Sequence, residues 1–268
     1  MNNPVKLFVV EGEDRDCRFV QEMTQCFFAT GKYQAKVINL PASQNIYMLY
    51  QLLQDDDFET DIVELLRDNV KTAGKILEGI TRQDIDEVYL FFDYDIHQNN
   101  LPRVTTQTAD EILESMIKTF DNETDNGKLY ISYPMVEALY DYKTSMCESY
   151  SGCYVPIESL SDYKTIVGEG NPNANVRFEI EEWKEVISIF ILRVQCLFDL
   201  DEVSFYTYRK LIFPESINKK ETSLKNEYGK VFVLSALPEF ILDYFRENFW
   251  NSMVKRKRKA FDDCPKKA

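Results

Sequence analysis

Patterns of buried strands alternate with helical patterns over the first half of the chain. Residues 5–10 form an apolar, β-branched run apart from Lys6, and residues 87–93 contain the run VYLFF. Continuous apolar runs of this length are typical of strands buried on both faces of a sheet. Residues 34–40, which alternate apolar and polar positions, and the short stretch 128–132 predict two further strands.

Apolar residues recur at helical spacing between these strands. The spacing predicts helices over residues 14–28, 46–53, 62–80 and 109–120. We expect a further helix to open at Pro134, because proline is well tolerated in a first helical turn. Strands alternating with helices indicate right-handed crossovers, and therefore an α/β fold with a mainly parallel sheet flanked by helices.

The second half of the chain has a different pattern. Residues 146–175 are rich in Ser, Gly, Pro and Asn and predict a connection, and the pattern beyond them is mostly helical, over 178–198, 203–213 and 237–254. We therefore expect an α/β domain at 1–145, a connection at 146–175, a largely helical C-terminal region at 176–254 and a basic tail at 255–268.

Charge limits the partners that this chain can bind. The formal net charge is −14, and the tail from Asn251 onward holds seven Lys or Arg and two Asp, so it contributes +5 and leaves −19 on the rest. A body this acidic repels phosphates, so nucleic acid must be held by a local basic strip, a divalent metal or a partner chain.

Cysteine usage and hydropathy indicate a cytoplasmic protein. The six cysteines form no CxxC pair and His97 is the one histidine, so we expect reduced thiols rather than a zinc site. We expect no targeting segment. No apolar run approaches the ~20 residues needed to span a bilayer, so no membrane span is expected either.

Carboxylates follow the two strongest strand patterns. Glu11 and Gly12 end the first, and Asp93 and Asp95 end the second. Ligands of open parallel sheets bind outside the carboxyl ends of strands, and alternate strand residues point the same way. Carboxylates brought this close repel one another unless a cation such as Mg²⁺ or Mn²⁺ binds them. The alternative is that such acids are helix caps or solvated loop residues, which fits Asp14 and Asp16 at the next helix start.

These strand ends resemble the Toprim domain, in which one strand ends in Glu-Gly and a later strand in Asp-x-Asp. Glu11 matches the glutamate of that motif, and Asp93 and Asp95 match its aspartate pair. Many members have an acid four positions after the glutamate, where this chain has Arg15, but RloB-like proteins have it five positions on, which fits Asp16. The segment ISYPMVE, ending at Glu137, is similar to the Ser-x-Pro…Glu segment of RloB-like proteins, so the resemblance covers about residues 5–142.

The resemblance implies a Rossmann-like sheet and metal-dependent phosphodiester chemistry. Glu11 would be a general acid/base or a metal ligand, and Asp93 and Asp95 would hold Mg²⁺ or Mn²⁺. Glu137, with Asp16 or Glu13, would complete a second metal position.

Among Toprim proteins, the short chain favours a nuclease over a topoisomerase, and it has no recognisable zinc module of a primase. Stand-alone relatives of the RloB-like and OLD type are effectors of bacterial anti-phage defence, controlled by an ATPase of the OLD or ABC type. This sequence has no G-x-x-x-x-G-K-[ST] loop, so ATP dependence would come from another chain. The expected substrate is DNA or RNA, including tRNA.

Basic residues provide candidate contacts to nucleic acid. His97 and Lys143 are candidates near the acidic site, although a solvated role is the simpler interpretation of each. The run Lys255, Arg256, Lys257 and Arg258 suits a nucleic-acid backbone, an acidic surface such as that of a second copy of this chain, or a solvated helix end.

Two other function classes stay open. Asp93-x-Asp95 superficially fits a phosphohydrolase with an aspartate nucleophile, although His97 replaces the usual Thr or Val of that motif. The acidic body would also suit a non-catalytic binding subunit of a defence complex.

Overall fold

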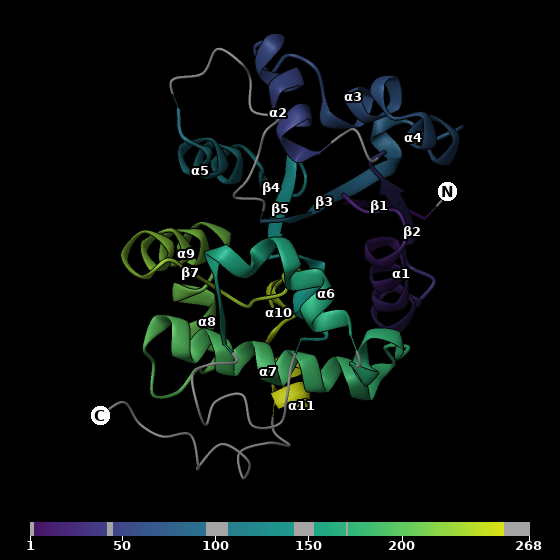
Figure 1. Cartoon of the computed structure of the whole chain (residues 1–268). Helices are drawn as coiled ribbons and strands as arrows, with labels where there is room; N and C mark the ends of the chain where they lie inside the picture. Colours follow the sequence, from purple (N-terminus) through teal and green to yellow (C-terminus); the bar gives the residue numbers. More distant parts are fainter. Residues whose placement is uncertain (1–2, 42–44, 95–106, 142–152, 170, 255–268) are drawn as a thin grey trace. The chain divides into compact units, whose positions relative to one another are not determined.

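The computed structural model describes residues 3–41, 45–94, 107–141, 153–169 and 171–254. The chain divides into two compact units, Met1–Tyr130 and Ile131–Ala268, and the boundary falls within strand β5. Figure 1 labels the elements in chain order.

The first unit is built on a five-stranded sheet in the order β2-β1-β3-β5-β4. Strand β1 is parallel to both β2 and β3, whereas β4 and β5 are antiparallel. The expected α/β fold with a mainly parallel sheet is confirmed. The strands are β1 (Val5–Val10), β2 (Gln34–Asn39), β3 (Ile85–Asp93), β4 (Asp121–Asn122) and β5 (Gly127–Ser132).

The central strand β1 is buried along its whole length, as its apolar run predicts. The ring of Phe8 stacks on Tyr89 and Phe91 of β3, at centroid distances of 5.6 and 6.4 Å. Lys6 is the one charged residue of β1, and its ammonium contacts the Glu87 carboxylate, so the buried charge is paired. These contacts hold β1 and β3 in register, which determines where their carboxyl ends meet.

Helices flank the sheet of the first unit, and in Figure 1 the sheet separates α1 from α2, α3 and α4. Side-chain caps set several helix starts: the Asn45 side chain accepts from the Met48 N–H, and Thr108 and Glu111 form a capping box. The helices are α1 (Arg15–Phe27), α2 (Ile46–Asp55), α3 (Ile62–Asn69), α4 (Lys71–Ile76) and α5 (Ala109–Thr119), with a 3-10 turn at Arg82–Asp84.

The prediction of a single helix over residues 62–80 is wrong. The segment forms two helices, because Val70 adopts an extended conformation (φ −114°, ψ 105°) between α3 and α4. Val70 is fully buried in that conformation, and the Asn69 side chain bonds back to the Leu65 carbonyl oxygen. Tertiary burial of a β-branched residue therefore overrides the continuous helical spacing.

The second unit is largely helical, as expected. Helices α10 and α11 pack on α7, and two short strands, β6 and β7, form an antiparallel pair. Its helices are α6 (Tyr163–Gly168), α7 (Ile180–Phe198), α8 (Phe205–Leu211), α9 (Pro214–Tyr228), α10 (Ala236–Tyr244) and α11 (Glu247–Val254). Its strands are β6 (Tyr154–Pro156) and β7 (Lys230–Phe232), and its 3-10 helices are Val136–Leu139, Ile157–Asp162 and Pro172–Asn175.

The prediction that a helix begins at Pro134 is wrong. Tyr133 forms an antiparallel bridge with Leu234, and Met135 is also extended, so the first helical turn begins only at Val136 and is a 3-10 turn. The continuous helix expected over 237–254 is interrupted as well, between Tyr244 and Glu247. In the part of the chain that the structure describes, no helix is long and apolar enough to cross a membrane.

Candidate acidic site

Two of the predicted carboxylates lie at the carboxyl ends of neighbouring strands. Strand β1 ends at Val10, which is paired with Phe91 of β3, so Glu11 and Asp93 leave the sheet side by side. The Glu11 Oε2 atom accepts a long hydrogen bond, at 3.4 Å, from the backbone N–H of Asp93, and this contact spans the two strand ends. Both residues are partly exposed, so a ligand can reach them. The structure therefore brings Glu11 and Asp93 together, as the strand pattern predicted.

Asp16 joins this corner from the first turn of α1. Its carboxyl group lies against the backbone of Gly12, since a β-carbon built on Gly12 would come within 2.9 Å of the Asp16 Cγ atom and closer to Oδ2. Gly12 follows Glu11 directly, so its missing side chain leaves the space that the Asp16 carboxyl occupies. Arg15 opens α1, and Asp14 precedes that helix without a side-chain capping bond, so the capping alternative is not realised by Asp14.

The start of α1 carries a negative electrostatic potential that the sequence interpretation did not use. Burial raises the pKa of Cys17 to about 11, and the negative charges of Asp16, Glu13 and Asp14 add to that increase. The thiol is therefore protonated at neutral pH and is neither a nucleophile nor a metal-binding thiolate. The raised pKa of Cys17 instead reports the negative electrostatic potential at the start of α1, because the acidic surroundings that suppress ionisation of the thiol also attract a cation.

Glu137 belongs to the second compact unit. It lies in the 3-10 turn Val136–Leu139 and is almost fully buried, with Lys164 Nζ 3.9 Å from its Oε1 atom. Four residues on, the Asp141 carboxylate accepts a hydrogen bond of 2.8 Å from the Tyr163 hydroxyl. Arg193 donates to the Asp141 carbonyl oxygen. Glu137 thus sits at the edge of a buried polar network of the second unit.

The remaining predicted residues lie outside the described parts of the chain. They are Asp95, His97, Lys143, Lys255, Arg256, Lys257 and Arg258. Within the described parts, no group of three or more His, Cys, Asp or Glu residues is arranged to hold a metal ion. Glu11 and Asp93 do meet, through the Glu11 carboxylate and the Asp93 backbone N–H, and carboxylate oxygens are the hard donors that Mg²⁺ or Mn²⁺ prefers. The third predicted ligand, Asp95, follows two residues after Asp93.

Arg193 and Glu221 are among the buried ionisable residues that the sequence pattern did not single out. Arg193 lies on the buried side of α7, and its signal was available, since it interrupts the most apolar run of the chain, residues 186–192. Glu221 is fully buried on α9, a helix that the pattern did not predict. Its position four residues after the buried Ile217 is the signal that would have placed it on the core face.

Comparison with known proteins adds no family to this description: no family model, no curated protein and no solved structure matches the chain.

Proposed function

We propose that this chain is a Toprim-type, metal-dependent nuclease whose acidic site is built around Glu11 and Asp93. The observation that carries the proposal is the 3.4 Å contact between the Glu11 carboxylate and the Asp93 backbone N–H. It joins the two sequence motifs, 82 residues apart, at one rim of a mainly parallel sheet. Ligands of open α/β sheets bind at this rim.

The residues of the site suit hydrolysis of a phosphodiester. A divalent cation would act there as a Lewis acid, activating water and neutralising the charge that develops on the phosphate. Asp93 and Asp95 are the proposed ligands, and Asp16 extends the acidic surface at Gly12. Glu11 is the proposed general acid/base or a further ligand. The backbone N–H of Asp93 donates a long hydrogen bond of 3.4 Å to the Glu11 carboxylate.

Charge supports a substrate that is held locally. The acidic body repels nucleic acid over most of its surface, so the proposed contacts are the cation and the basic run Lys255, Arg256, Lys257 and Arg258. We propose DNA or RNA as substrate, tRNA included, and a role as effector in anti-phage defence with an ATPase of the OLD or ABC type. These assignments rest on the resemblance of the motifs.

The direct test measures metal binding and cleavage on the same protein. The full chain is titrated with Mn²⁺ by electron paramagnetic resonance and incubated with DNA, RNA and tRNA in Mg²⁺ or Mn²⁺, alone and with its ATPase partner. Glu11→Ala and Asp93→Ala should each abolish cleavage and weaken Mn²⁺ binding at least about tenfold. Glu59→Ala is the matched control, because Glu59 is exposed and lies in the loop between α2 and α3.

The outcomes separate the alternatives. If the chain binds Mn²⁺ but cleaves no nucleic acid, the proposed metal site is supported and the proposed nuclease activity is refuted. A chain that neither binds Mn²⁺ nor cleaves, yet still binds a basic partner, would favour the acidic binding subunit that the net charge of −14 also suits.

A further inference from the structure

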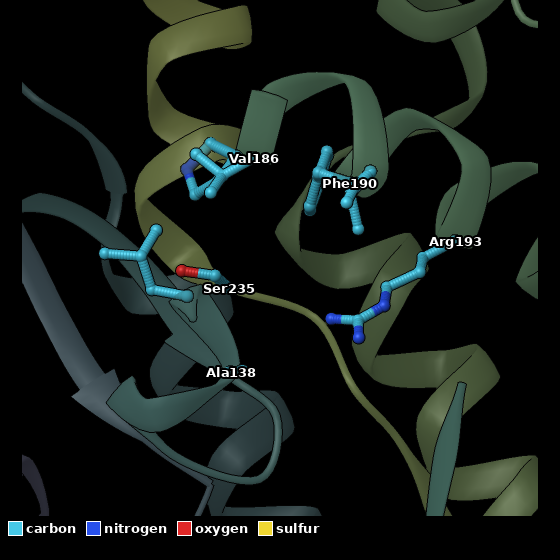
Figure 2. A pocket seen from close by; sticks show the side chains of 8 residues that line it. Ala138, Val186, Phe190, Arg193 and Ser235 are labelled. Carbon is cyan, nitrogen blue, oxygen red and sulfur yellow. The ribbon is translucent and has the colours of Figure 1, made fainter. Parts of the chain in front are cut away.

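The second unit contains a pocket that the proposed nuclease chemistry does not use. Its lining residues come from the turn near Val136–Leu139, from α7 and from the start of α10: Ala138, Leu139, Val186, Ile189, Phe190, Arg193, Ser235 and Pro238. The pocket has a volume of about 230 Å³ with its open mouth included, and its closed part has room for about one water-sized group. In Figure 2 the Arg193 side chain extends toward the segment that carries Ser235.

A buried hydroxyl without a partner marks the closed part of this pocket. Ser235 is 5% exposed, and its Oγ atom has no hydrogen-bond partner among the residues that the structure describes. The cause is local: Ser235 precedes α10 at the capping position, but the third residue of that helix is Pro238, which has no N–H to donate. Leaving a buried polar atom unpaired is unfavourable, so a ligand that bonds to the Ser235 hydroxyl relieves part of that cost.

A cation lies in the same lining. Arg193 is 3% exposed and its guanidinium donates to the Asp141 carbonyl oxygen, a neutral acceptor. The other lining side chains are apolar apart from Ser235. The start of α10 adds a positive partial charge, since the N-terminus of a helix favours an anion. A positive charge, a hydroxyl donor and hydrocarbon walls together fit an amphipathic anion.

The surroundings favour an anion with a single charge. Asp141 and Glu137 both raise the pKa of the buried Tyr163 hydroxyl, after burial itself, while Arg193 lowers it. Arg193, Asp141 and Glu137 therefore all act on the same hydroxyl, and Glu239 adds a further acid in the first turn of α10. A dianion such as a phosphate ester would meet more repulsion than a carboxylate does.

We infer that this pocket binds a small monocarboxylate, with its carboxylate on Arg193 and the Ser235 hydroxyl and its hydrocarbon body against Val186, Ile189 and Phe190. The site lies wholly within the second compact unit. Neither Glu11 nor Asp93 belongs to this pocket, so the test of carboxylate binding does not depend on the proposed nuclease activity.

The test uses butyrate as the probe on the full chain, with butyramide and inorganic phosphate as comparison ligands. Ligand-observed NMR and calorimetry at constant ionic strength should show saturable binding of butyrate, with a dissociation constant of about 1 mM for its six heavy atoms. Butyramide and phosphate should bind at least about tenfold more weakly, because one lacks the charge and the other the shape.

Variants identify the pocket. Ser235→Ala should weaken butyrate binding about tenfold, which is the loss of one hydrogen bond to a charged group. Ser235→Val should abolish binding, since it adds a methyl group to the closed part, and Arg193→Lys should weaken binding at least as much as Ser235→Ala. Ser223→Ala is the matched control, because Ser223 is exposed on α9 and bonds only to its own helix at Lys219.

Three results would overturn the inference: no saturable butyrate binding up to ~20 mM, equal binding of butyramide, or unchanged binding in Ser235→Ala. If Arg193→Lys fails to fold, as tryptophan fluorescence would show, the two Ser235 variants still decide the question.

Discussion

The buried carboxyl group of Glu221 makes the stability of the second unit depend on pH in a direction that can be stated beforehand. Glu221 is 0% exposed, and one of its oxygens accepts a 2.9 Å hydrogen bond from the Phe232 N–H. Its other oxygen, Oε1, has no hydrogen-bond partner among the described residues. Burial raises the pKa of Glu221 well above its ordinary value of 4.5, and the Phe232 bond opposes that rise only in part.

The sign follows from which state holds the proton. Above about pH 4.5 the unfolded chain releases the Glu221 proton, while the folded chain keeps it up to the raised pKa. The folded state then binds one more proton than the unfolded state, so raising the pH favours unfolding. The contribution is fully present below the ordinary pKa and is lost at about 1.4 kcal/mol per pH unit as the pH rises through this window.

Glu221→Gln removes this dependence, because the amide is neutral at every pH and its oxygen can still accept from Phe232. The free energy of unfolding of the wild type minus that of the variant should fall by about 1.4 kcal/mol between pH 5 and pH 6. At pH 5 the two proteins should differ by no more than ~1–3 kcal/mol, the cost of one unpaired amide donor. The variant should therefore be favoured progressively over the wild type as the pH rises.

Urea denaturation followed by tryptophan fluorescence measures this difference. Both tryptophans, Trp183 and Trp250, lie in the second unit and are buried, so their fluorescence reports the unit that holds Glu221. Glu227→Gln is the matched control, since Glu227 is exposed on the same helix. A difference that stays flat from pH 5 to pH 6, or a control variant that changes equally, would refute the assignment of a protonated Glu221.

Two further predictions concern the acidic site. Gly12→Ala should cost less than ~1.5 kcal/mol of stability, since the Asp16 side chain can rotate away from the new methyl group, yet it should weaken Mn²⁺ binding about tenfold. Gly74→Ala is its control, because a β-carbon there meets only the Arg67 carbonyl oxygen at 3.6 Å, and equal Mn²⁺ affinities of the two variants would contradict the role of Asp16. Cys17, with a pKa of about 11, should react with iodoacetamide at pH 8 about a hundredfold more slowly in the folded chain than in urea. Asp16→Asn should speed that reaction, and peptide mass spectrometry that finds equal rates in folded and unfolded chains would show that the thiol is not suppressed.

The parts of the fold that were predicted correctly are those in which local pattern and tertiary environment agree. Strand β1 is apolar at all positions but Lys6 and is buried at every one, so its sequence pattern is enough to predict a buried strand. The break at Val70 could not be predicted in this way. Helical spacing continues through residues 62–80, and the extended conformation of Val70 is set by burial in the fold rather than by its neighbours in sequence.

The candidate site shows the same division. The contact between Glu11 and Asp93 follows from two strand patterns and the parallel-sheet rule, because neighbouring strands present their carboxyl ends at one rim. The contact of Asp16 with Gly12 depends on the turn between β1 and α1, for which the sequence offers only a glycine and a run of acids. The Arg193–Ser235 pocket joins side chains 42 positions apart through helix packing and the proline at the start of α10, and neither strand nor helix periodicity encodes such a meeting.

Because these features lie in different units, a variant that loses metal binding or cleavage can be distinguished from a variant that fails to fold. Glu11, Asp93 and Asp16 belong to the unit Met1–Tyr130, whereas both tryptophans, Glu221 and the carboxylate pocket belong to Ile131–Ala268. A Glu11→Ala variant that loses Mn²⁺ binding should therefore keep the wild-type circular dichroism, tryptophan unfolding curve and butyrate affinity. If all of these change together, the carboxylate supports the structure of the whole chain, and loss of cleavage in that variant would no longer argue for a role in catalysis.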